Sequence, residues 1–562
     1  MIRFDSKPFD LNDEQIQWIK STFNSMSEDE KIGQMFCPLV FTRYERELKN
    51  LVEKYHVGAV VGCAGQGNEV RKVNAVLQKH TAIPLLIASD LESGGQGATS
   101  DGTHFGSEML VAATGNDERA YELGKVSCAE AASVGVNWAF APVVDLDMNY
   151  HNPIMNIRTF GDDPDAVIQM GKEYLRAAGE EGVATACKHF PGDGMDERDQ
   201  HLLTSVNSCS VDEWDRTYGR IYEEMIAAGT KTIMVGHIAL PAYEEYFDKC
   251  EIDHIIPATL SSNLMQKLLR EKLGFNGLIT SDATPMTGFG SALDRETAVP
   301  LSIENGCDIF LFSRDLEEDI GFMKQGLKNG ILSAGRLEEA VLRILALKAS
   351  MNLPEKQKSG ALVPEGNALE VLNCSRFDAW AKACSDEGVT LVKDTQQLLP
   401  LNPIKHKRVL LELIGGYESD DRVCKCFSEL LTKEGFEVTI YPQEGFKSMD
   451  NSVASLKGKY DLIMYIANTE APANKTTARL NWQTMFGMGI NVPWMVHELP
   501  VILISVGNPY CLLDAPMIKT CINGYCNSKY VINAVMEKIM GRSSFRGRSP
   551  IDPFCGKIDT RF

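Results

Sequence analysis

Two segments of the sequence hold residues that could perform acid–base and nucleophilic chemistry. The first reads Ala186-Cys-Lys-His-Phe-Pro-Gly-Asp-Gly-Met-Asp-Glu-Arg-Asp-Gln-His201. Its Asp199 and His201 are two residues apart, so both side chains can project to the same side of an extended segment. A carboxylate beside an imidazole fixes the tautomer of the ring and stabilises its protonated form, which suits a general acid/base. A solvated surface pair would show the same spacing, so the spacing alone leaves the role open.

The second segment is Gly277-Leu-Ile-Thr-Ser-Asp282, an apolar run that ends in a carboxylate. A carboxylate in such a place can attack an anomeric carbon and form a covalent glycosyl-enzyme. The structural alternative is that Asp282 caps the turn that follows. The loop that carries Asp199 also contains Gly192 and Gly194, whose backbones tolerate the changes of a hinge.

The elements that position these residues are predicted by apolar runs between residues 30 and 350. Each run has the length of a buried strand, and together they comprise Ile32–Cys37, Val57–Cys63, Pro84–Asp90, Trp138–Asp145, Thr185–Phe190, Thr232–His237, Gly277–Asp282 and Asp308–Ser313. Helical patterns follow most of them, as at Asn116–Ser133, Asp163–Glu181, Val211–Ala228 and Ser261–Leu273. Apolar strands separated by helices indicate a parallel sheet covered on both faces, and eight such units predict a (β/α)8 barrel.

Five of these runs end in ionisable side chains: Asp90, Asp145, Lys188 with His189, His237 and Asp282. Barrel enzymes keep their active sites at the carboxyl ends of the strands. One or two such charges could simply end a strand at the surface, but five in the same position favour a site.

The remainder of the chain predicts a second, smaller domain. Residues 352–366 are rich in Pro, Lys, Gly and Glu and are typical of a linker. Beyond them lie further strand-like runs with helical patterns between most of them, at Arg408–Ile414, Phe436–Tyr441, Asp461–Ala467, Pro500–Val506 and Thr520–Tyr525. We therefore expect a barrel over residues 1–350, a linker and connecting helix over 351–385, and a doubly wound αβα sandwich over 386–562.

Composition narrows the function classes. The 562 residues carry a net charge of −20, which argues against nucleic acid or an anionic membrane as a partner and favours a small-molecule carbohydrate. The N-terminal residues contain no apolar signal segment, so we expect a cytoplasmic protein, and the fifteen scattered cysteines are expected to be reduced, mostly buried thiols. Neither metal nor organic cofactor is implied, and the spacing of Cys424 and Cys426 suits no zinc site. The oligomeric state is not readable.

The motifs resemble glycoside hydrolase family 3, and within it the bacterial β-N-acetylglucosaminidases. The matching segments occur in the family's order: Val136-Asn-Trp-Ala-Phe-Ala-Pro-Val-Val-Asp145, Asn156-Ile-Arg-Thr-Phe-Gly-Asp-Asp-Pro164, Lys188-His-Phe-Pro-Gly192, Gly236-His-Ile-Ala-Leu-Pro241, Pro257-Ala-Thr-Leu-Ser261 and Ser281-Asp282. The second domain is more faintly similar to that of two-domain members, through Glu387-Gly-Val-Thr-Leu-Val-Lys-Asp394 and Leu398-Leu-Pro-Leu401.

This resemblance assigns roles residue by residue. It implies that Asp282 is the nucleophile, and that Asp199 and His201 take the place of the Asp-Ser-His acid/base motif that selects N-acetylglucosamine. It also implies that the −1 subsite contains four residues that bind sugar hydroxyls: Asp90, Arg158, Lys188 and His189. To these we add His237 and Asp145, two further polar residues at strand ends. The implied reaction is a retaining double displacement that releases terminal β-linked N-acetylglucosamine from oligosaccharides or muropeptides.

Two departures from the family pattern bear on specificity. The pattern Asp-x-Glu-Gly-Gly-Arg-Val-x-Arg is here Asp90-Leu-Glu-Ser-Gly-Gly-Gln-Gly-Ala98, without either arginine. The family's Pro-Gly-His-Gly-Asp-Thr is here Pro191-Gly-Asp193-Gly-Met195-Asp196. Three alternatives therefore stay open: a β-glucosidase or β-xylosidase, a non-catalytic sugar-binding protein, and a phosphorylase. The last arises because an imidazole base, unlike a carboxylate, does not repel a phosphate acceptor.

Overall fold

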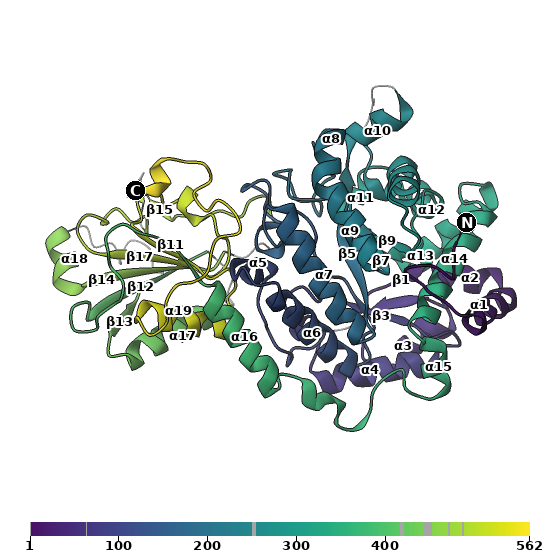
Figure 1. Ribbon diagram of the computed structural model, residues 1–562, viewed down its shortest axis with the longest axis horizontal. Helices are drawn as coiled ribbons and strands as arrows, with labels where there is room; N and C mark the ends of the chain where they lie inside the picture. Colours follow the sequence, from purple (N-terminus) through teal and green to yellow (C-terminus); the bar gives the residue numbers. More distant parts are fainter. Residues whose placement is uncertain are drawn as a thin grey trace. The chain divides into compact units, whose positions relative to one another are not determined.

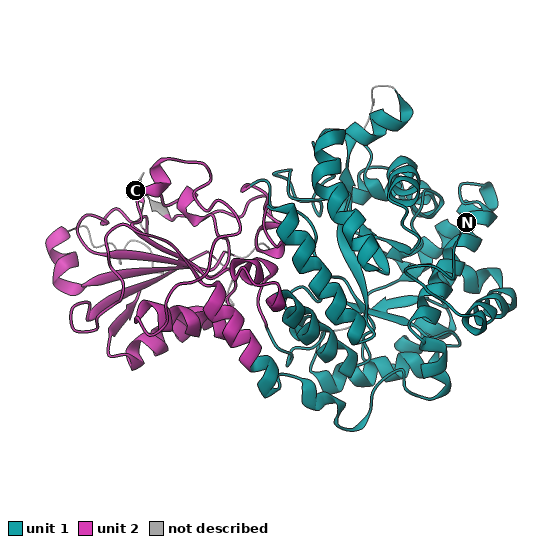
Figure 2. Ribbon diagram, viewed as in Figure 1, with its two compact units in different colours: residues 1–104, 120–149, 163–378 teal, residues 105–119, 150–162, 379–562 magenta. Residues whose placement is uncertain are grey.

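The computed structural model describes residues 2–62, 64–249, 255–415, 421–441, 452–469, 473–485, 488–489 and 491–562. The chain forms two compact units (Figure 2). Unit 1 comprises Met1–His104, Ala120–Asn149 and Asp163–Asp378, and unit 2 comprises Phe105–Arg119, Tyr150–Asp162 and Ala379–Phe562. The domain boundaries expected from the sequence remain a prediction. No helix in the described part of the chain is long and apolar enough to cross a membrane.

Unit 1 is built on a ring of parallel strands (Figure 1). Its strands are β1 (Phe36–Cys37), β2 (Ala59–Val61), β3 (Leu86–Ser89), β4 (Trp138–Ala139), β5 (Ala184–Phe190), β7 (Thr232–Val235), β9 (Leu278–Ser281) and β10 (Phe310–Leu311). Six of them pair in the order β2-β3-β4-β5-β7-β9, and β1 pairs with β10. Parallel bridges from Leu39 to Val61 and from Thr280 to Ile309 join the two sheets on both sides, so the ring closes.

Helices follow each strand of the ring and cover its outside. In chain order they are α3 (Glu45–Glu53), α4 (Gly67–His80), α6 (Glu118–Ser133), α7 (Pro164–Glu180), α9 (Arg220–Ala228), the π-helical η5 (Asn263–Lys272), α12 (Arg295–Glu304), α13 (Leu316–Asn329) and α14 (Ala334–Ser350). The start of α7 illustrates how the sequence sets these boundaries, because Asp163 accepts a hydrogen bond from the amide of Asp165 and Pro164 occupies the first turn.

The interior of the ring is filled with side chains. Trp138 of β4 is fully buried, and its indole nitrogen donates to Thr232 of β7 across 2.9 Å. The strands are buried along their whole length, which explains why each appears in the sequence as a continuous apolar run rather than an alternating one.

Unit 2 contains a six-stranded sheet in the order β11-β18-β17-β14-β12-β13. The strands are β11 (Thr390–Asp394), β12 (Arg408–Ile414), β13 (Glu437–Ile440), β14 (Leu462–Ala467), β17 (Val501–Ser505) and β18 (Thr520–Asn523). All pairs are parallel except β11 with β18, and the main helices are α17 (Asp421–Lys433), α18 (Val453–Lys459) and α19 (Lys529–Ile539). The five predicted strands are confirmed, and the antiparallel edge strand β11 was not predicted.

The predicted fold class, a (β/α)8 barrel followed by a smaller α/β sandwich, is confirmed. The segment predicted as a linker is partly helical, because α15 (Leu353–Lys358) buries Leu353 and Pro354. The described cysteines are free thiols and are mostly buried, as predicted.

Candidate active site

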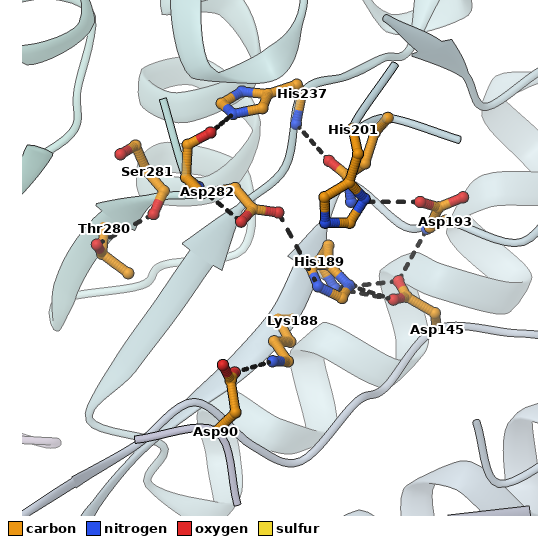
Figure 3. A network of polar contacts seen from close by, with 12 residues as sticks. Asp90, Asp145, Lys188, His189, Asp193, His201, His237, Thr280, Ser281 and Asp282 are labelled. Carbon is orange, nitrogen blue, oxygen red and sulfur yellow. Dashed lines mark hydrogen bonds and ion pairs between the residues drawn. The ribbon is translucent and has the colours of Figure 1, made fainter. Parts of the chain in front are cut away.

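The carboxyl ends of the barrel strands hold most of the predicted site residues (Figure 3). Lys188 and His189 belong to the end of β5, while Asp90 and Asp282 directly follow β3 and β9. Asp145 and His237 follow β4 and β7 by a few residues. Because parallel strands of a closed ring end at the same rim, residues from distant parts of the sequence meet there.

Asp282 lies at the centre of this rim. Its backbone nitrogen donates to the carbonyl of Val235 across 2.8 Å, and its side chain is only 12% exposed. Burial acts to raise the pKa of Asp282, but electrostatic interactions with the imidazoles of His189, His237 and His201, with a hydrogen bond from the amide of Ala283, outweigh it and lower the pKa. The carboxylate is therefore ionised and able to act as a nucleophile near neutral pH.

Asp145 holds His189 against the nucleophile. The carboxylate of Asp145 is fully buried and accepts a 2.7 Å bond from Nδ1 of His189, in addition to bonds from the backbone amides of His189 and Asp193. On the other side of the ring, Nε2 of His189 lies 4.0 Å from Oδ2 of Asp282. Asp145 thus fixes the tautomer and orientation of the imidazole that faces the nucleophile.

Lys188 links two carboxylates of the segment after β3. Its Nζ lies 3.0 Å from Oδ1 of Asp90 and 2.7 Å from Oε1 of Glu92. The lysine side chain is 3% exposed, whereas that of Asp90 is 64% exposed. Asp90 is therefore accessible to a ligand, while Lys188 is buried and bonded to Glu92. Glu92 was not predicted as a site residue, although it stands in the quoted motif; its pairing with Lys188 becomes visible only in three dimensions.

The glycine-rich segment after Asp90 folds back onto it. A side chain at Gly97 would place its Cβ 1.7 Å from the carbonyl oxygen of Asp90, so only glycine fits there. Ser89 donates from its hydroxyl to the carbonyl of Gly97 across 2.6 Å. The segment that lacks the family's arginines therefore forms a tight turn that supports Asp90.

Asp199 and His201 form the predicted dyad. Nδ1 of His201 lies 2.6 Å from Oδ1 of Asp199, and the same carboxylate oxygen accepts from the amide of His201 across 2.9 Å. Asp199 is buried, and Nδ1 donates to it, so Nε2 is the nitrogen that can exchange a proton with a ligand. The carbonyl of His201 accepts from the amide of Thr287, five residues after Asp282, across 2.9 Å, and its ring contributes to the lowered pKa of Asp282, so the dyad and the nucleophile lie in one site.

His237 is buried with both ring nitrogens bonded inside the protein. Nδ1 lies 2.9 Å from the hydroxyl oxygen of Thr259, and Nε2 lies 3.0 Å from the carbonyl of Ala283. Burial lowers the pKa of His237 despite the opposing charge of Asp282, so the ring is neutral and its Nε2 donates to Ala283. His237 thereby holds the residue that follows the nucleophile.

Arg158 is the one predicted sugar-binding residue that lies in unit 2. It ends the short helix η2 (Asn156–Arg158). Its role in the site remains a prediction.

Residues 27–347 match the model of the glycosyl hydrolase family 3 N terminal domain. Over the full length of both chains, the sequence is 41% identical to a β-N-acetylglucosaminidase/β-glucosidase of Cellulomonas fimi. The chain belongs to glycoside hydrolase family 3.

Solved structures agree with this assignment. A β-glucoside phosphorylase, BglX, is 42% identical, with a TM-score of 0.92 and 99% of each chain covered. A family 3 β-N-acetylglucosaminidase from Paenibacillus sp. str. FPU-7 is 23% identical, with a TM-score of 0.79 over 94% of this chain and 99% of that one, and shows the shared fold. The family 3 chain is thus a glycosidase, and these three relatives are all named for β-linked sugars.

Proposed function

We propose that this family 3 enzyme is a retaining exo-glycosidase that releases terminal β-linked N-acetylglucosamine and also accepts β-glucosides. The observation that carries this proposal is the Asp199–His201 dyad, held at 2.6 Å within the same site as Asp282. A glucoside activity is included because the relative from Cellulomonas fimi is named for both activities.

The mechanism follows from the charges of the site. Asp282, kept ionised by the surrounding imidazoles, attacks the anomeric carbon, and the C1–O bond to the leaving group breaks as a covalent glycosyl-enzyme forms. His201, protonated and oriented by Asp199, donates its Nε2 proton to the leaving oxygen. In the second half, neutral His201 takes a proton from the acceptor, which attacks C1 and releases the sugar with β configuration.

We propose that the other residues act in two groups. Asp90 is exposed to a ligand and can accept hydrogen bonds from sugar hydroxyls, with Lys188 and His189 beside it. Asp145 and His237, assigned to sugar binding from the sequence, are instead positioning residues, because their polar atoms are bonded to His189, Thr259 and Ala283 inside the protein. Cytoplasmic localisation is also proposed.

Phosphorolysis is a second candidate because of the relative named a β-glucoside phosphorylase. The acid/base of this site is an imidazole, which is neutral when it must act as base and so does not repel a phosphate anion. Phosphate would then replace water as the acceptor, and the product would be a sugar 1-phosphate.

The test is a comparison of p-nitrophenyl N-acetylglucosaminide, glucoside and xyloside, each with and without inorganic phosphate. Hydrolysis of the first two supports the proposal, and phosphate-dependent formation of sugar 1-phosphate selects phosphorolysis. Turnover of the xyloside alone would overturn the substrate assignment.

Variants test the residue roles. Asp282→Asn should lower kcat/KM by about 10⁴-fold or more, since it removes the nucleophile. His201→Ala should lower kcat/KM by about 10²- to 10⁴-fold for poor leaving groups, but little for dinitrophenyl glycosides, which need no acid. His80→Ala, at a histidine paired with Glu45 and Glu53 outside the site, is the matched control. Equal losses on both substrate types would contradict the assignment of His201 as acid.

A further inference from the structure

Gln200 stands between the two members of the dyad, and its side chain is fully buried. Its Oε1 accepts from the backbone nitrogen of His237 across 2.8 Å, and its Nε2 donates to Oδ2 of Asp193 across 3.3 Å. The side chain therefore bridges the segment after β7 and the segment after β5; its two partners, His237 and Asp193, are labelled in Figure 3.

The partners of Gln200 belong to the network that holds the nucleophile. The backbone nitrogen of Asp193 donates to Oδ1 of Asp145 across 2.8 Å, and Asp145 in turn holds His189 beside Asp282. The position of the dyad is thus tied through hydrogen bonds to the same carboxylate that orients the imidazole facing the nucleophile.

The backbone around Gln200 also packs closely against the segment that contains Thr287 and Gly288. The carbonyl of His201 accepts from the amide of Thr287 across 2.9 Å, and a Cβ at Gly288 would lie 2.5 Å from the carbonyl oxygen of Gln200. Gly194, at the other end of the loop, has a φ of +98°, and a Cβ there would lie 1.7 Å from the carbonyl oxygen of Leu146. The loop is docked at several points, and the side chain of Gln200 reaches two of the surrounding segments.

We propose that Gln200, through Asp193 and the amide of His237, is a positioning residue that docks the acid/base loop over the nucleophile before a sugar binds. This inference rests on the proposed role of His201 as acid/base. Both positions depart from the family pattern quoted above, which has serine in place of Gln200 and histidine in place of Asp193. A serine side chain is too short to make both bonds, so a chain with the family's serine cannot dock its loop in this way.

Because Gln200 donates and Asp193 accepts, the proposal can be tested by exchanging the donor and the acceptor between the two residues. Oδ1 of Asp193 accepts from the amide of Gly194 across 2.7 Å, which leaves Oδ2 for Gln200. Asp193→Asn places an NH₂ group opposite the NH₂ of Gln200, and Gln200→Glu places a carboxylate opposite the carboxylate of Asp193. The double variant restores one donor and one acceptor, and the introduced carboxylate can still accept from the amide of His237.

The first measurement is kcat/KM at pH 8 on the p-nitrophenyl glycoside turned over best and on an alkyl glycoside of the same sugar. We expect each single variant to lose about 10-fold or more on the alkyl glycoside and less than about 3-fold on the aryl one, because only the former needs a proton from His201. The double variant should return to within about 3-fold of the wild type. A double variant no better than the worse single one, or equal losses on both substrates, would overturn the proposal.

The second measurement is amide hydrogen exchange of residues 193–203 in the free enzyme, which does not depend on the chemical assignment. Exchange should increase by about 10-fold or more in each single variant and return to the wild-type rate in the double variant. Unchanged exchange in the folded single variants would refute the docking role. If exchange responds as expected but His201→Ala shows no dependence on the leaving group, the acid/base assignment fails and the docking stands.

Discussion

Replacing Asp145 with Asn tests whether the charge of this buried carboxylate sets the pKa of the nucleophile, Asp282. The two carboxylates are linked through the imidazole of His189, which contacts both. Asn keeps the shape of the side chain but removes its negative charge. It also presents an NH₂ group where Asp145 accepts bonds from the ring and amide of His189 and from the amide of Asp193. The imidazolium form of His189 then loses the carboxylate that stabilises it.

The size of the effect can be worked from the 4.0 Å between Nε2 of His189 and Oδ2 of Asp282. Two unit charges at about 4 Å interact by about 4 kcal/mol at an effective dielectric constant of about 20. That energy corresponds to about 3 pKa units, which is the upper limit for complete loss of the positive charge. We expect the pKa of Asp282 to rise by at least about one unit, since part of the charge and the contributions of His237 and His201 remain.

The assay is the pH dependence of kcat/KM between pH 4 and 8. The nucleophile must be ionised, so activity is lost as the pH falls through the pKa of Asp282, and a raised pKa moves this loss to higher pH. The plateau should also fall by about 10- to 100-fold, because a charge-assisted hydrogen bond that orients His189 contributes about 1.5–3 kcal/mol. Asp319→Asn on helix α13, at a buried carboxylate paired with Arg295 of α12, should leave the acid limb of the pH profile in place. A folded Asp145→Asn enzyme whose acid limb has not moved would refute the reasoning.

Three stability predictions concern buried charges in unit 1. Burial and the neighbouring Asp145 raise the pKa of Asp193 to about 7, so the wild type loses stability as the pH rises from about 4 to about 7, by up to about 1.4 kcal/mol per pH unit. In urea denaturation between pH 5 and 8, Asp193→Asn should lose this slope, and an unchanged slope would contradict it. Burial lowers the pKa of Lys348 to about 7, so the wild type gains stability as the pH rises from 7 to 10. Lys348→Met should remove that rise and stabilise the protein at pH 6–7 by about 2–4 kcal/mol, after subtraction of its lost bond to Gln34, again by denaturant titration. Asp308→Ala should lower the free energy of unfolding by about 3–5 kcal/mol, because it leaves three buried arginines without their shared carboxylate, and a calorimetric midpoint equal to that of the wild type would exclude this.

The barrel was predictable because its strands are buried on both faces, and a strand buried on both faces consists of an unbroken run of apolar residues. The run at Gly277–Asp282 and the strand Leu278–Ser281 agree closely for this reason. Edge strand β11 was missed because its Thr-Leu-Val-Lys-Asp sequence contains only two apolar residues and the strand is only partly buried. The strand predicted at Trp138–Asp145 is a regular strand only over Trp138–Ala139, with one further bridge from Val143 to Lys188, because strand pairing depends on the neighbouring strands and not on the apolar run alone.

By itself, the sequence determined which residue types stand at the ends of the strands and in the loop after Phe190, and so the nucleophile and dyad that we propose. Only the tertiary structure decided what each of these side chains contacts. Asp145 bonds to His189 and His237 bonds to the carbonyl of Ala283, so both hold other residues of the protein. Glu92 forms an ion pair with Lys188, and Gln200 accepts from the backbone nitrogen of His237. The physical reason is that apolar periodicity reports burial along one segment, whereas a hydrogen bond between strands far apart in the chain depends on how the ring closes.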